Sequence, residues 1–376
     1  MAKQSFVPSS VKIKVIGVGG GGCNAVTRMV RQQIRGVEFI AMNTDAQHLA
    51  VTEAPIRLQL GDRVTRGLGA GGDHTMGRKA ADESRDEIKE LIAGSDMVFV
   101  TGGMGGGTGT GASPIVAEVA KQTGALTIGI VTKPFTFEGR HRCEVAEEGI
   151  SNLIKKVDTL IIIPNDRLLA LCDKRTSVDS AFQFADDVLR QGIQSISEVI
   201  TVPGLINLDF ADVRAIMKES GPAWMSIGVG TGANRAADAA KAALASPLLD
   251  VSINGARGVL FNVVGGSSLT LLEVNEAAEV IRRAVDPEAN IIFGVVHDDT
   301  MDHEVRITLV ATGFVTQGGV LTWEREDEVN KLLLGLRDNE DKLDAPSFLR
   351  HPRFAIRRAM PLPAEPEKAP SSSIIE

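Results

Sequence analysis

The distribution of glycine is the feature that most limits how this chain can fold. Seventeen of its 39 glycines lie in three short segments, at residues 17–22, 67–77 and 102–111. The first and third segments begin where an apolar, β-branched run ends, and a helical pattern follows each of them. Glycine at a strand-to-helix junction leaves backbone N–H groups accessible, and such groups bind phosphate oxygens. The glycine segments therefore predict a phosphate site at the edge of an α/β sheet.

Strand and helix patterns alternate through the first two hundred residues. Strands are expected at residues 12–17, 37–43, 96–101, 125–132 and 159–164. Helices are expected between them at residues 24–34, 77–92, 113–122 and 143–155. This alternation is typical of βαβ units in a parallel sheet, in which ligands bind beyond the carboxyl ends of the strands.

A long helical pattern at residues 177–200 is followed by a second α/β block. That block contains expected strands at residues 224–230, 259–265, 290–296 and 305–313, and expected helices at residues 233–245 and 271–285. Beyond residue 314 an acidic stretch precedes a basic tail rich in proline and serine. We therefore divide the chain into a nucleotide-binding domain (1–176), a central helix (177–202), a C-terminal α/β domain (203–316), an acidic spacer (317–342) and a tail (343–376).

Charge and cysteine content argue against several classes of protein. The net charge is −8, whereas a nucleic-acid-binding protein is expected to carry a basic surface. The three cysteines are far apart and in no CxxC spacing, which argues against a disulfide framework or a zinc site and fits a reducing cytosol. No apolar run reaches the ~18 residues of a membrane span. We expect a cytoplasmic protein with no nucleic-acid partner and no direct transmembrane anchor.

The first glycine segment, GVGGGG, has more than one interpretation. It fits the GxGxxG pattern of dinucleotide-binding folds, and Asp45 follows the next expected strand, as such folds require. A NAD-dependent oxidoreductase, a protein that binds another nucleotide and a purely structural turn are all compatible with this segment alone.

The third glycine segment contains GGGTGTG at residues 105–111 and favours a triphosphate. A dehydrogenase needs one phosphate loop, whereas a triphosphate can use two, and the two threonines add hydroxyl groups. The chain has no GxxxxGK[ST] sequence and therefore lacks the lysine of a P-loop. Backbone dipoles, a bound metal ion and Arg142 are expected to neutralise the phosphates instead.

The sequence NLDFAD at residues 207–212 lies at the start of an expected helix. Asp209 and Asp212 are three residues apart and would share one helical face. Either the two acids cap the helix and interact with its positive end, or they orient and deprotonate a water molecule. The second interpretation requires a reactive phosphate within hydrogen-bond reach.

Histidines and acids also gather between His297 and Glu304, in the order HDDTMDHE. Such residue types can bind a metal ion. Because this stretch separates two expected strands, we expect a solvated hairpin turn and assign no metal ligand to it.

The sequence GGGTGTG resembles the signature of the tubulin and FtsZ superfamily. From about residue 12 to residue 314 the chain resembles the FtsZ family of cell-division GTPases. Further motifs carry the resemblance: GVGGGGCNAV, MNTD at 42–45, GLGAGG at 67–72, TKPFTFEG from Thr132 and NLDFADV from Asn207. The resemblance implies an α/β fold in which a Rossmann-like GTPase domain with a parallel sheet is joined by a central helix to a smaller α/β domain.

The resemblance also implies a site for GTP or GDP. The phosphates would be held by Gly20, Gly21, Gly22, Cys23, Asn24, Gly107, Thr108 and Gly109, with Gly71 near the γ-phosphate. Glu138 and Arg142 would flank the ribose and phosphates, and Asn165, Phe182 and Asp186 would contact guanine. Asn43, Ala70 and Thr132 complete the expected binding set. Mg²⁺ is the expected metal, with no ligand residues assigned.

By the same resemblance, Asn207, Asp209 and Asp212 would form a synergy loop that enters the nucleotide pocket of the next subunit. Hydrolysis would then require head-to-tail filaments of the chain with itself, which would form the cytokinetic ring at the division site. The segment from Leu343 to Arg350 is similar to the family's adaptor-binding peptide and implies a membrane-tethering partner. The competing hypotheses are a non-hydrolysing tubulin-like scaffold and, from the first glycine segment, an NAD-dependent oxidoreductase.

Overall fold

The computed structural model describes residues 11–169, 175–202, 206, 208–248, 253, 255–298, 300–301 and 303–314. Contacts divide the chain into two units, Met1–Val315 and Thr316–Glu376, and the second unit lies wholly outside the described residues. Three expected features therefore fall outside the described part: Asn207, the acidic spacer at 317–342 and the adaptor-like segment at 343–350. The division into domains stays a prediction.

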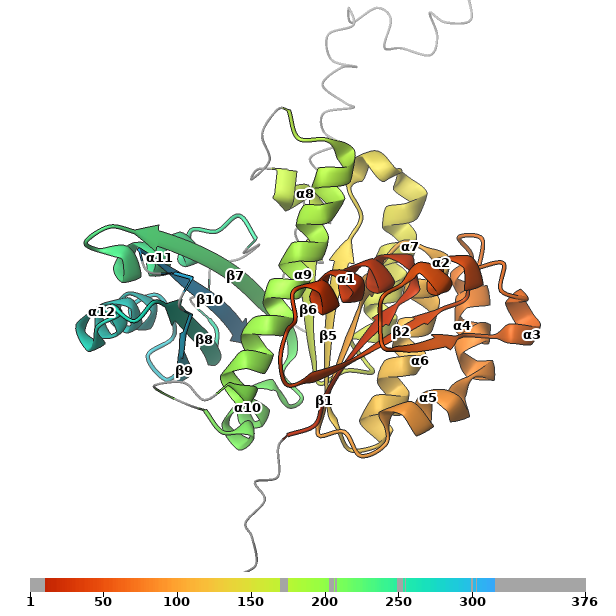
Figure 1. Ribbon diagram of the computed structural model, residues 1–376, viewed down its shortest axis with the longest axis horizontal. Coiled ribbons are helices and arrows are strands. Elements are labelled where there is room, and N and C mark those ends of the chain that lie inside the picture. Colours follow the sequence, from red (N-terminus) through yellow and green to blue (C-terminus); the bar gives the residue numbers. More distant parts are fainter. Residues whose placement is uncertain are drawn as a thin grey trace, which may run out of the picture. The chain divides into compact units, whose positions relative to one another are not determined.

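Across the described residues, one sheet of ten strands runs through the first unit (Figure 1). Its order is β3-β2-β1-β4-β5-β6-β7-β10-β8-β9. The strands are β1 (Ile13–Val18), β2 (Val37–Asn43), β3 (Ile56–Gln59), β4 (Met97–Gly103), β5 (Leu126–Lys133), β6 (Thr159–Pro164), β7 (Gly221–Thr231), β8 (Gly258–Gly265), β9 (Asn290–His297) and β10 (Glu304–Thr312). Pairing is parallel from β3 to β7 and between β8 and β9, whereas β10 pairs antiparallel with β7 and β8. A parallel block is thus continued by a mixed one.

Helices cover both faces of the parallel block. They are α1 (Gly19–Arg31), α2 (Ala46–Val51), α3 (Asp62–Thr65), α4 (His74–Glu83), α5 (Arg85–Ile92), α6 (Gly107–Gln122), the 3-10 helix η1 (Thr136–Glu138), α7 (Arg140–Leu153), α8 (Asn165–Leu168) and α9 (Val178–Thr201). Along β1, Ile13 and Val15 join a core shared with α1 and α9, whereas Ile16 and Val18 join a core shared with α4, α5, α6 and α7. A sheet buried on both faces requires the nearly continuous apolar strands that the sequence contains.

Helix α9 links the parallel block to the mixed one. It begins after Ser177, whose hydroxyl accepts a hydrogen bond from the N–H of Ser180 at 3.1 Å. Its 24 residues span about 36 Å at 1.5 Å per residue. The helix contacts β5 and β6 on one side and β8 and β9 on the other, and its last turn leads towards α10 (Phe210–Met217). Figure 1 shows α8 and α10 near opposite ends of this helix.

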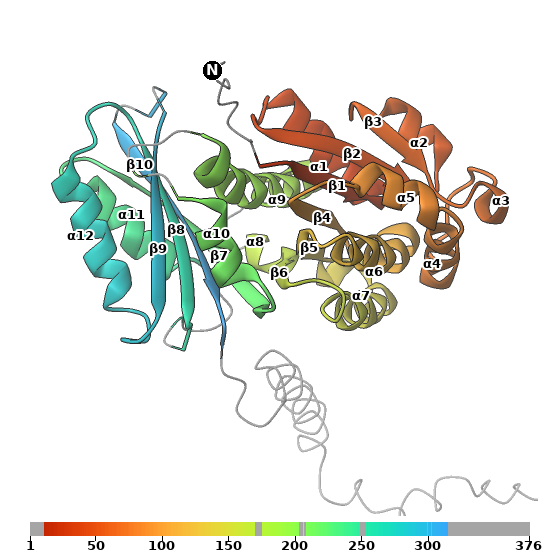
Figure 2. The same cartoon turned by 90° about the horizontal axis from the view of Figure 1, so that it is seen from below.

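The mixed block has a core of its own. Helices α11 (Arg235–Leu244) and α12 (Leu271–Arg282) pack against each other and against this part of the sheet (Figure 2). Ala239, Phe261 and Ile307 are fully buried in that core, and the rings of Phe261 and Phe293 stack with centroids 5.2 Å apart. Among the described residues, no helix is both long and apolar enough to span a membrane.

Most expected strands and helices are confirmed within a few residues, but three differences are informative. Helices α1 and α6 begin at Gly19 and Gly107, inside the glycine segments, and not after them as expected. The single helix expected at 77–92 is two helices, α4 and α5, separated at Ser84. The Ser84 hydroxyl accepts a hydrogen bond from the N–H of Gly61 at 3.1 Å, a long-range contact with no local pattern. The short strand β3 was not expected at all.

The expected hairpin at residues 297–304 is wrong. Strands β9 and β10 are consecutive in sequence, yet β8 lies between them in the sheet. The connection therefore crosses from one side of β8 to the other, and β10 gains partners in β7 and β8 instead of one in β9. Within it, Asp298 closes a turn by accepting a hydrogen bond from the N–H of Thr300 at 3.0 Å. The described residues contain no group of three or more His, Cys, Asp and Glu placed to hold a metal ion.

Candidate functional site

A cavity of about 400 Å³ lies at the carboxyl edge of the parallel strands. Strands β2, β4 and β5 reach it at Asn43, Gly103 and Thr132, and Asn165 follows β6 directly. Further wall residues come from α1, α2, α6, η1, α7, α9 and the loop at 67–72. This is the edge at which ligands bind in open parallel sheets.

Two helices begin at this cavity without a side-chain cap. The residues before α1 and α6 are Val18 and Gly106, neither helix start receives a capping side-chain hydrogen bond, and neither first turn contains an acid. The neighbouring helices α2 and α4, in contrast, are capped by Asp45 and Asp73. Free N–H groups and the positive end of the helix dipole make each uncapped start a favourable place for an anion. Two such starts on one cavity favour a ligand with more than one phosphate.

The two helix starts touch through bare backbone, which explains the glycines. Gly19 has a φ of +71°, in the left-handed region that glycine adopts without strain. A Cβ at Gly19 would lie 2.8 Å from the backbone nitrogen of Gly109, and a Cβ at Gly109 would lie 2.5 Å from the carbonyl oxygen of Gly103. A side chain at Gly19 would push the starts of α1 and α6 apart, and one at Gly109 would push the start of α6 away from the end of β4. Glycine is therefore needed here for packing as well as for access to phosphate.

The second glycine segment is fastened to the end of β2. The N–H of Gly69 donates to the carbonyl oxygen of Thr44 at 3.1 Å, and the N–H of Ala46 donates to the carbonyl oxygen of Gly67 at 3.0 Å. Gly71 is exposed, and a Cβ there would meet no atom within 4 Å. The tip of this loop is thus open towards a ligand while its base is held.

On another part of the wall Phe182 lines the cavity, and two further phenylalanines, which do not line it, pack behind or beside it. Phe135 is fully buried, stacks on Phe137 with ring centroids 4.9 Å apart, and meets Phe182 edge-on at 5.4 Å. The Oε1 atom of Glu138 accepts a hydrogen bond from the N–H of Phe135 at 2.9 Å, and its Oε2 atom lies 2.9 Å from Nη1 of Arg142. This part of the wall therefore presents one aromatic side chain, Phe182, together with one acid and one cation.

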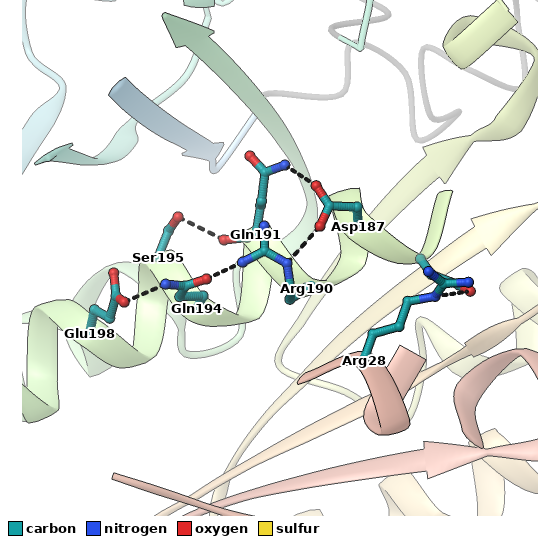
Figure 3. A network of polar contacts seen from close by, with 8 residues as sticks. Arg28, Asp187, Arg190, Gln191, Gln194, Ser195 and Glu198 are labelled. Atoms are coloured by element: carbon teal, nitrogen blue, oxygen red, sulfur yellow. Dashed lines mark hydrogen bonds and ion pairs between the residues drawn. The ribbon is translucent and has the colours of Figure 1, made fainter. Parts of the chain in front are cut away.

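Two polar side chains on this wall have unused capacity for hydrogen bonds. Asn165 is 4% exposed, and its Oδ1 atom has no hydrogen-bond partner in the described part of the chain. Asp186 on α9 forms an ion pair with Arg28 of α1, with Oδ2 and Nε 3.0 Å apart (Figure 3). Burial raises the pKa of Asp186 to about 6, although the Arg28 guanidinium acts to lower it. Both groups would gain from N–H donors on a ligand.

Most of the residues expected at a nucleotide lie together in this cavity. They are Gly20, Gly21, Asn43, Ala70, Gly71, Gly107, Thr108, Gly109, Thr132, Glu138, Arg142, Asn165, Phe182 and Asp186. Gly22, Cys23 and Asn24 do not line it, since Gly22 and Cys23 are buried within the fold and Asn24 is exposed. Burial raises the pKa of the Cys23 thiol to about 12, which makes that thiol unreactive.

Several residues of the cavity wall were not among those expected. They are Thr44, Asp45, His48, Leu68, Gly69, Gly72, Gly103, Met104, Gly106, Pro134 and Ala185. Thr44 and Asp45 belong to the MNTD motif, and the glycines belong to the three glycine segments, so the motifs contained a signal for them. His48 belongs to none of these motifs, and it reaches the cavity from the first turn of α2.

The acidic pair lies far from this cavity in the same chain. Asp209 is the N-cap of α10, and its Oδ1 atom accepts a hydrogen bond from the N–H of Asp212 at 2.9 Å. The other end of α10 is fixed at Met217, whose carbonyl oxygen accepts a hydrogen bond from the hydroxyl of Thr159, the first residue of β6. The cavity adjoins the other end of this strand, Pro164, which is about 17 Å from Thr159 at 3.3 Å per residue. Asp209 and Asp212 are both exposed, and capping is one role that Asp209 has.

Comparisons with known proteins agree with this architecture. The model of the Tubulin/FtsZ family, GTPase domain, matches residues 12–173, and the model of the FtsZ family, C-terminal domain, matches residues 221–315. The chain is similar to an empty FtsZ dimer from M. jannaschii, with 46% identity and a TM-score of 0.79 over 81% of this chain and 89% of that one.

Two more distant structures share the fold alone. CetZ1 from Haloferax volcanii, a GDP-bound monomer, is 20% identical with a TM-score of 0.72, over 87% of this chain and 100% of its own. CetZ2 from Haloferax volcanii, a GTPgS-bound protofilament, is 16% identical with a TM-score of 0.71, over 89% of this chain and 100% of its own. Two family models and a relative at 46% identity are decisive. The chain belongs to the FtsZ family, and its parallel block is the GTPase domain that defines the wider Tubulin/FtsZ family.

Proposed function

We propose that this protein binds GTP in the cavity and hydrolyses it when a second copy supplies Asn207, Asp209 and Asp212. One observation carries the proposal: the cavity and the acidic pair lie at opposite edges of the same sheet. A carboxylate must lie within hydrogen-bond reach of the water that it activates. One chain therefore cannot complete the site, whereas two chains placed head to tail can.

The cavity suits a guanine nucleotide. The uncapped starts of α1 and α6 suit the phosphates, and the exposed loop tip at Gly71 suits the terminal one. At the other end, Phe182 offers an aromatic surface, and the free Oδ1 of Asn165 and the carboxylate of Asp186 are acceptors. Guanine has adjacent N–H donors on its ring and its amino group, so it matches two acceptors better than adenine does. The GDP and GTPgS held by the two CetZ proteins support the same class of ligand.

Mg²⁺ fits this site as an ion that arrives with the phosphates. The described residues contain no group of three His, Cys, Asp and Glu that would build a protein cage for it. Mg²⁺ commonly keeps several waters and is held largely by substrate phosphates, so such a cage is not required. When bound, the ion would neutralise charge on the phosphates.

In this proposal the residues of the chain act mainly by positioning. The backbone N–H groups of residues 107–109 hold the phosphates in line, and Arg142 adds a positive charge. Asp209 and Asp212 of the next copy orient a water molecule and accept its proton as it attacks the γ-phosphate. Such positioning and electrostatic stabilisation account for most of the catalysis in phosphoryl transfer.

The same contact builds a filament. A contact between two different surfaces of identical subunits does not close on itself and repeats indefinitely. The dimer of the M. jannaschii relative and the protofilament of CetZ2 support assembly of this kind. We further propose that the filaments act at the division site in the cytoplasm, where the segment from Leu343 to Arg350 binds a membrane-tethering adaptor.

Mixing two variants tests the proposal. Asp212→Ala removes an acid but leaves the cavity intact, and Gly20→Leu alters the cavity but leaves the acids intact. Each variant alone should release little phosphate, whether or not it pellets as filaments. An equal mixture should recover activity, on the order of a quarter of the wild-type rate if assembly is random, because one interface in four joins an intact cavity to intact acids.

Three outcomes would contradict the proposal. Wild-type turnover by Asp212→Ala alone would remove the acid from the mechanism. No gain on mixing, with both variants present in the same filaments, would show that the site is not shared between subunits. Thermal stabilisation of the wild type by NAD but not by GDP would point to an oxidoreductase, and filaments without phosphate release would point to a scaffold.

A further inference from the structure

Arg28 does not line the cavity, yet it holds one of the residues that do. Its Nε atom donates to Oδ2 of Asp186 at 3.0 Å, which joins the third turn of α1 to the first half of α9 (Figure 3). The Asp186 side chain is only 14% exposed, whereas Arg28 is 37% exposed. A carboxylate so deeply covered needs a compensating cation to stay charged.

We propose that Arg28 is a positioning residue that keeps Asp186 ionised and aimed into the cavity, and thereby sets the preference for guanine over adenine. The inference rests on the proposed function, because it assigns a second residue to the recognition of the base. It adds that the preference for guanine depends on pH through the carboxyl group of Asp186.

The charge of Asp186 determines which purine it accepts. An ionised carboxylate offers only acceptors, and the ion pair with Arg28 occupies one position on Oδ2 and leaves Oδ1 available. The ring N–H and amino group of guanine are adjacent donors and match this carboxylate. Adenine presents an acceptor at the same ring nitrogen and would be repelled. A protonated Asp186 would carry an O–H donor, so the discrimination would weaken.

The charged groups around Asp186 are few, which makes Arg28 decisive. Burial raises the pKa of Asp186 to about 6, Asp187 raises it slightly further, and Arg28 alone lowers it. Burial acts to raise the pKa of Asp187, but Arg190, whose Nε lies 2.6 Å from Oδ1, lowers that pKa together with Gln191 and Arg28, and the net shift is downward. Arg190 is therefore already engaged with Asp187 and does not replace Arg28 (Figure 3).

The other titratable groups on the cavity wall are on different elements. Glu138 and Arg142 form their own ion pair between η1 and α7. His48 and Asp45 lie at the start of α2, where Asp45 accepts hydrogen bonds from two backbone N–H groups. None of these groups contributes to the shift in the pKa of Asp186.

The test compares GDP with ADP across pH in wild type and in Arg28→Gln. Affinities are measured by calorimetry from about pH 5.5 to about pH 8.5, and the ratio of the two affinities cancels the titration of the phosphates. GDP is used instead of GTP because it is not hydrolysed during the measurement. In wild type the ratio should fall at acid pH. In Arg28→Gln the pH at which the affinity ratio falls should be higher by about one unit or more. The preference for GDP is then lost near neutral pH and recovers at alkaline pH.

Three further variants give this test its controls. Arg31→Gln removes a cation from the same helix that pairs with the exposed Glu53, and it should leave the ratio unchanged. Arg28→Lys retains a positive charge and should restore part of the wild-type profile. Asp186→Asn removes the titrating group, so its ratio of GDP affinity to ADP affinity should be low and independent of pH. This variant tests the inference even if Arg28→Gln does not fold.

The results separate the inference from the function on which it rests. If wild type binds no GDP, the proposed function fails. If wild type binds GDP and Arg28→Gln folds but shows the wild-type profile, the function stands and the role of Arg28 is refuted. Persistence of the acid-dependent preference in Asp186→Asn would likewise refute it, because another group would then be titrating.

Discussion

The hydroxyl oxygens of Thr44 and Thr108 lie 2.6 Å apart in the protein interior, where they join the end of β2 to the first turn of α6. Thr44 is completely buried, and its carbonyl oxygen also accepts the N–H of Gly69. One residue therefore connects the loop at 67–72, through its main chain, with the helix start at 107, through its side chain. Through Gly19 and Gly109 that helix start also touches α1. The three glycine segments form one connected unit.

We expect Thr44→Val to weaken GDP binding. Valine keeps the shape of threonine but removes the partner of the Thr108 hydroxyl, at a cost of about 1 kcal/mol, or roughly fivefold in affinity. Calorimetry with GDP measures the change. Thr101→Val is the matched control, because the buried Thr101 hydroxyl has no partner among the described residues and its loss should be neutral or stabilising. Equal effects of the two substitutions on affinity would refute the role of Thr44.

Substitution of Asp209 separates helix capping from catalysis. Serine is also a good N-cap, so Asp209→Ser should keep the stability of the protein, whereas Asp209→Ala should lose about 1 kcal/mol in urea unfolding. Both variants lack the carboxylate, and both should lose phosphate release by about a hundredfold or more. Full activity in the serine variant would show that Asp209 acts only as a cap.

Two glycines of the same unit should respond in opposite ways to alanine. A Cβ at Gly77 would overlap the carbonyl oxygen of Gly107, so Gly77→Ala should destabilise the protein by about 1–3 kcal/mol. A Cβ at Gly20 would meet nothing within 4 Å, so Gly20→Ala should unfold no more easily than wild type while binding GDP less well. Urea unfolding without nucleotide, followed by GDP titration, measures both effects. A larger loss of stability in Gly20→Ala would contradict the packing described.

The ion pairs of Glu118 predict a dependence of stability on pH. Glu118 on α6 lies 2.5 Å from Nζ of Lys156 and 2.7 Å from Nη2 of Arg85, and these two partners lower its pKa below the usual 4.5. Its stabilising contribution is therefore complete above pH 4.5 and is lost as the pH falls through the lower folded value.

We accordingly expect Glu118→Gln to reduce the free energy of unfolding by about 1 kcal/mol at pH 7 and by less as the pH falls below 4.5. Urea unfolding at several pH values measures the difference. Glu144→Gln is the control, because Glu144 pairs with Arg140 on the exposed surface of α7 and its loss should change little. A deficit in Glu118→Gln that does not depend on pH would exclude the ion pairs as its cause.

The sequence predicted the parallel sheet because its strands are continuous apolar runs separated by helical patterns. It also predicted a phosphate site at the cavity, because two glycine segments follow strands and such strand ends meet at one edge. Wall residues such as Glu138, Asn165 and Asp186 were expected only from the resemblance to the FtsZ family. It did not predict that α1 and α6 start within the glycines, since glycine is a poor helix former. There the backbone contact between Gly19 and Gly109 outweighs local preference.

The other differences have separate causes. The break at Ser84 had a local signal that was not used, because SRDE at residues 84–87 is the S-x-x-E pattern of a helix start, and the Ser84 hydroxyl also accepts a hydrogen bond from Gly61, 23 residues away. The connection after His297 was expected to be a hairpin because two strand patterns flank it. The sequence did not reveal that β8 lies between these two strands in the sheet. The ion pair of Arg28 with Asp186 spans 158 residues and likewise has no local pattern.

The uncapped starts of α1 and α6 have a consequence for how the protein is maintained. Each lacks the side-chain cap that stabilises an ordinary helix by about 1 kcal/mol, so the empty domain is less stable than its secondary structure would allow. A bound anion supplies both missing caps at once. Its stabilising effect then grows with the ligand concentration relative to the dissociation constant. The ligand is in this sense a structural component of the fold, and depletion of the nucleotide pool would reduce the amount of folded protein together with its activity.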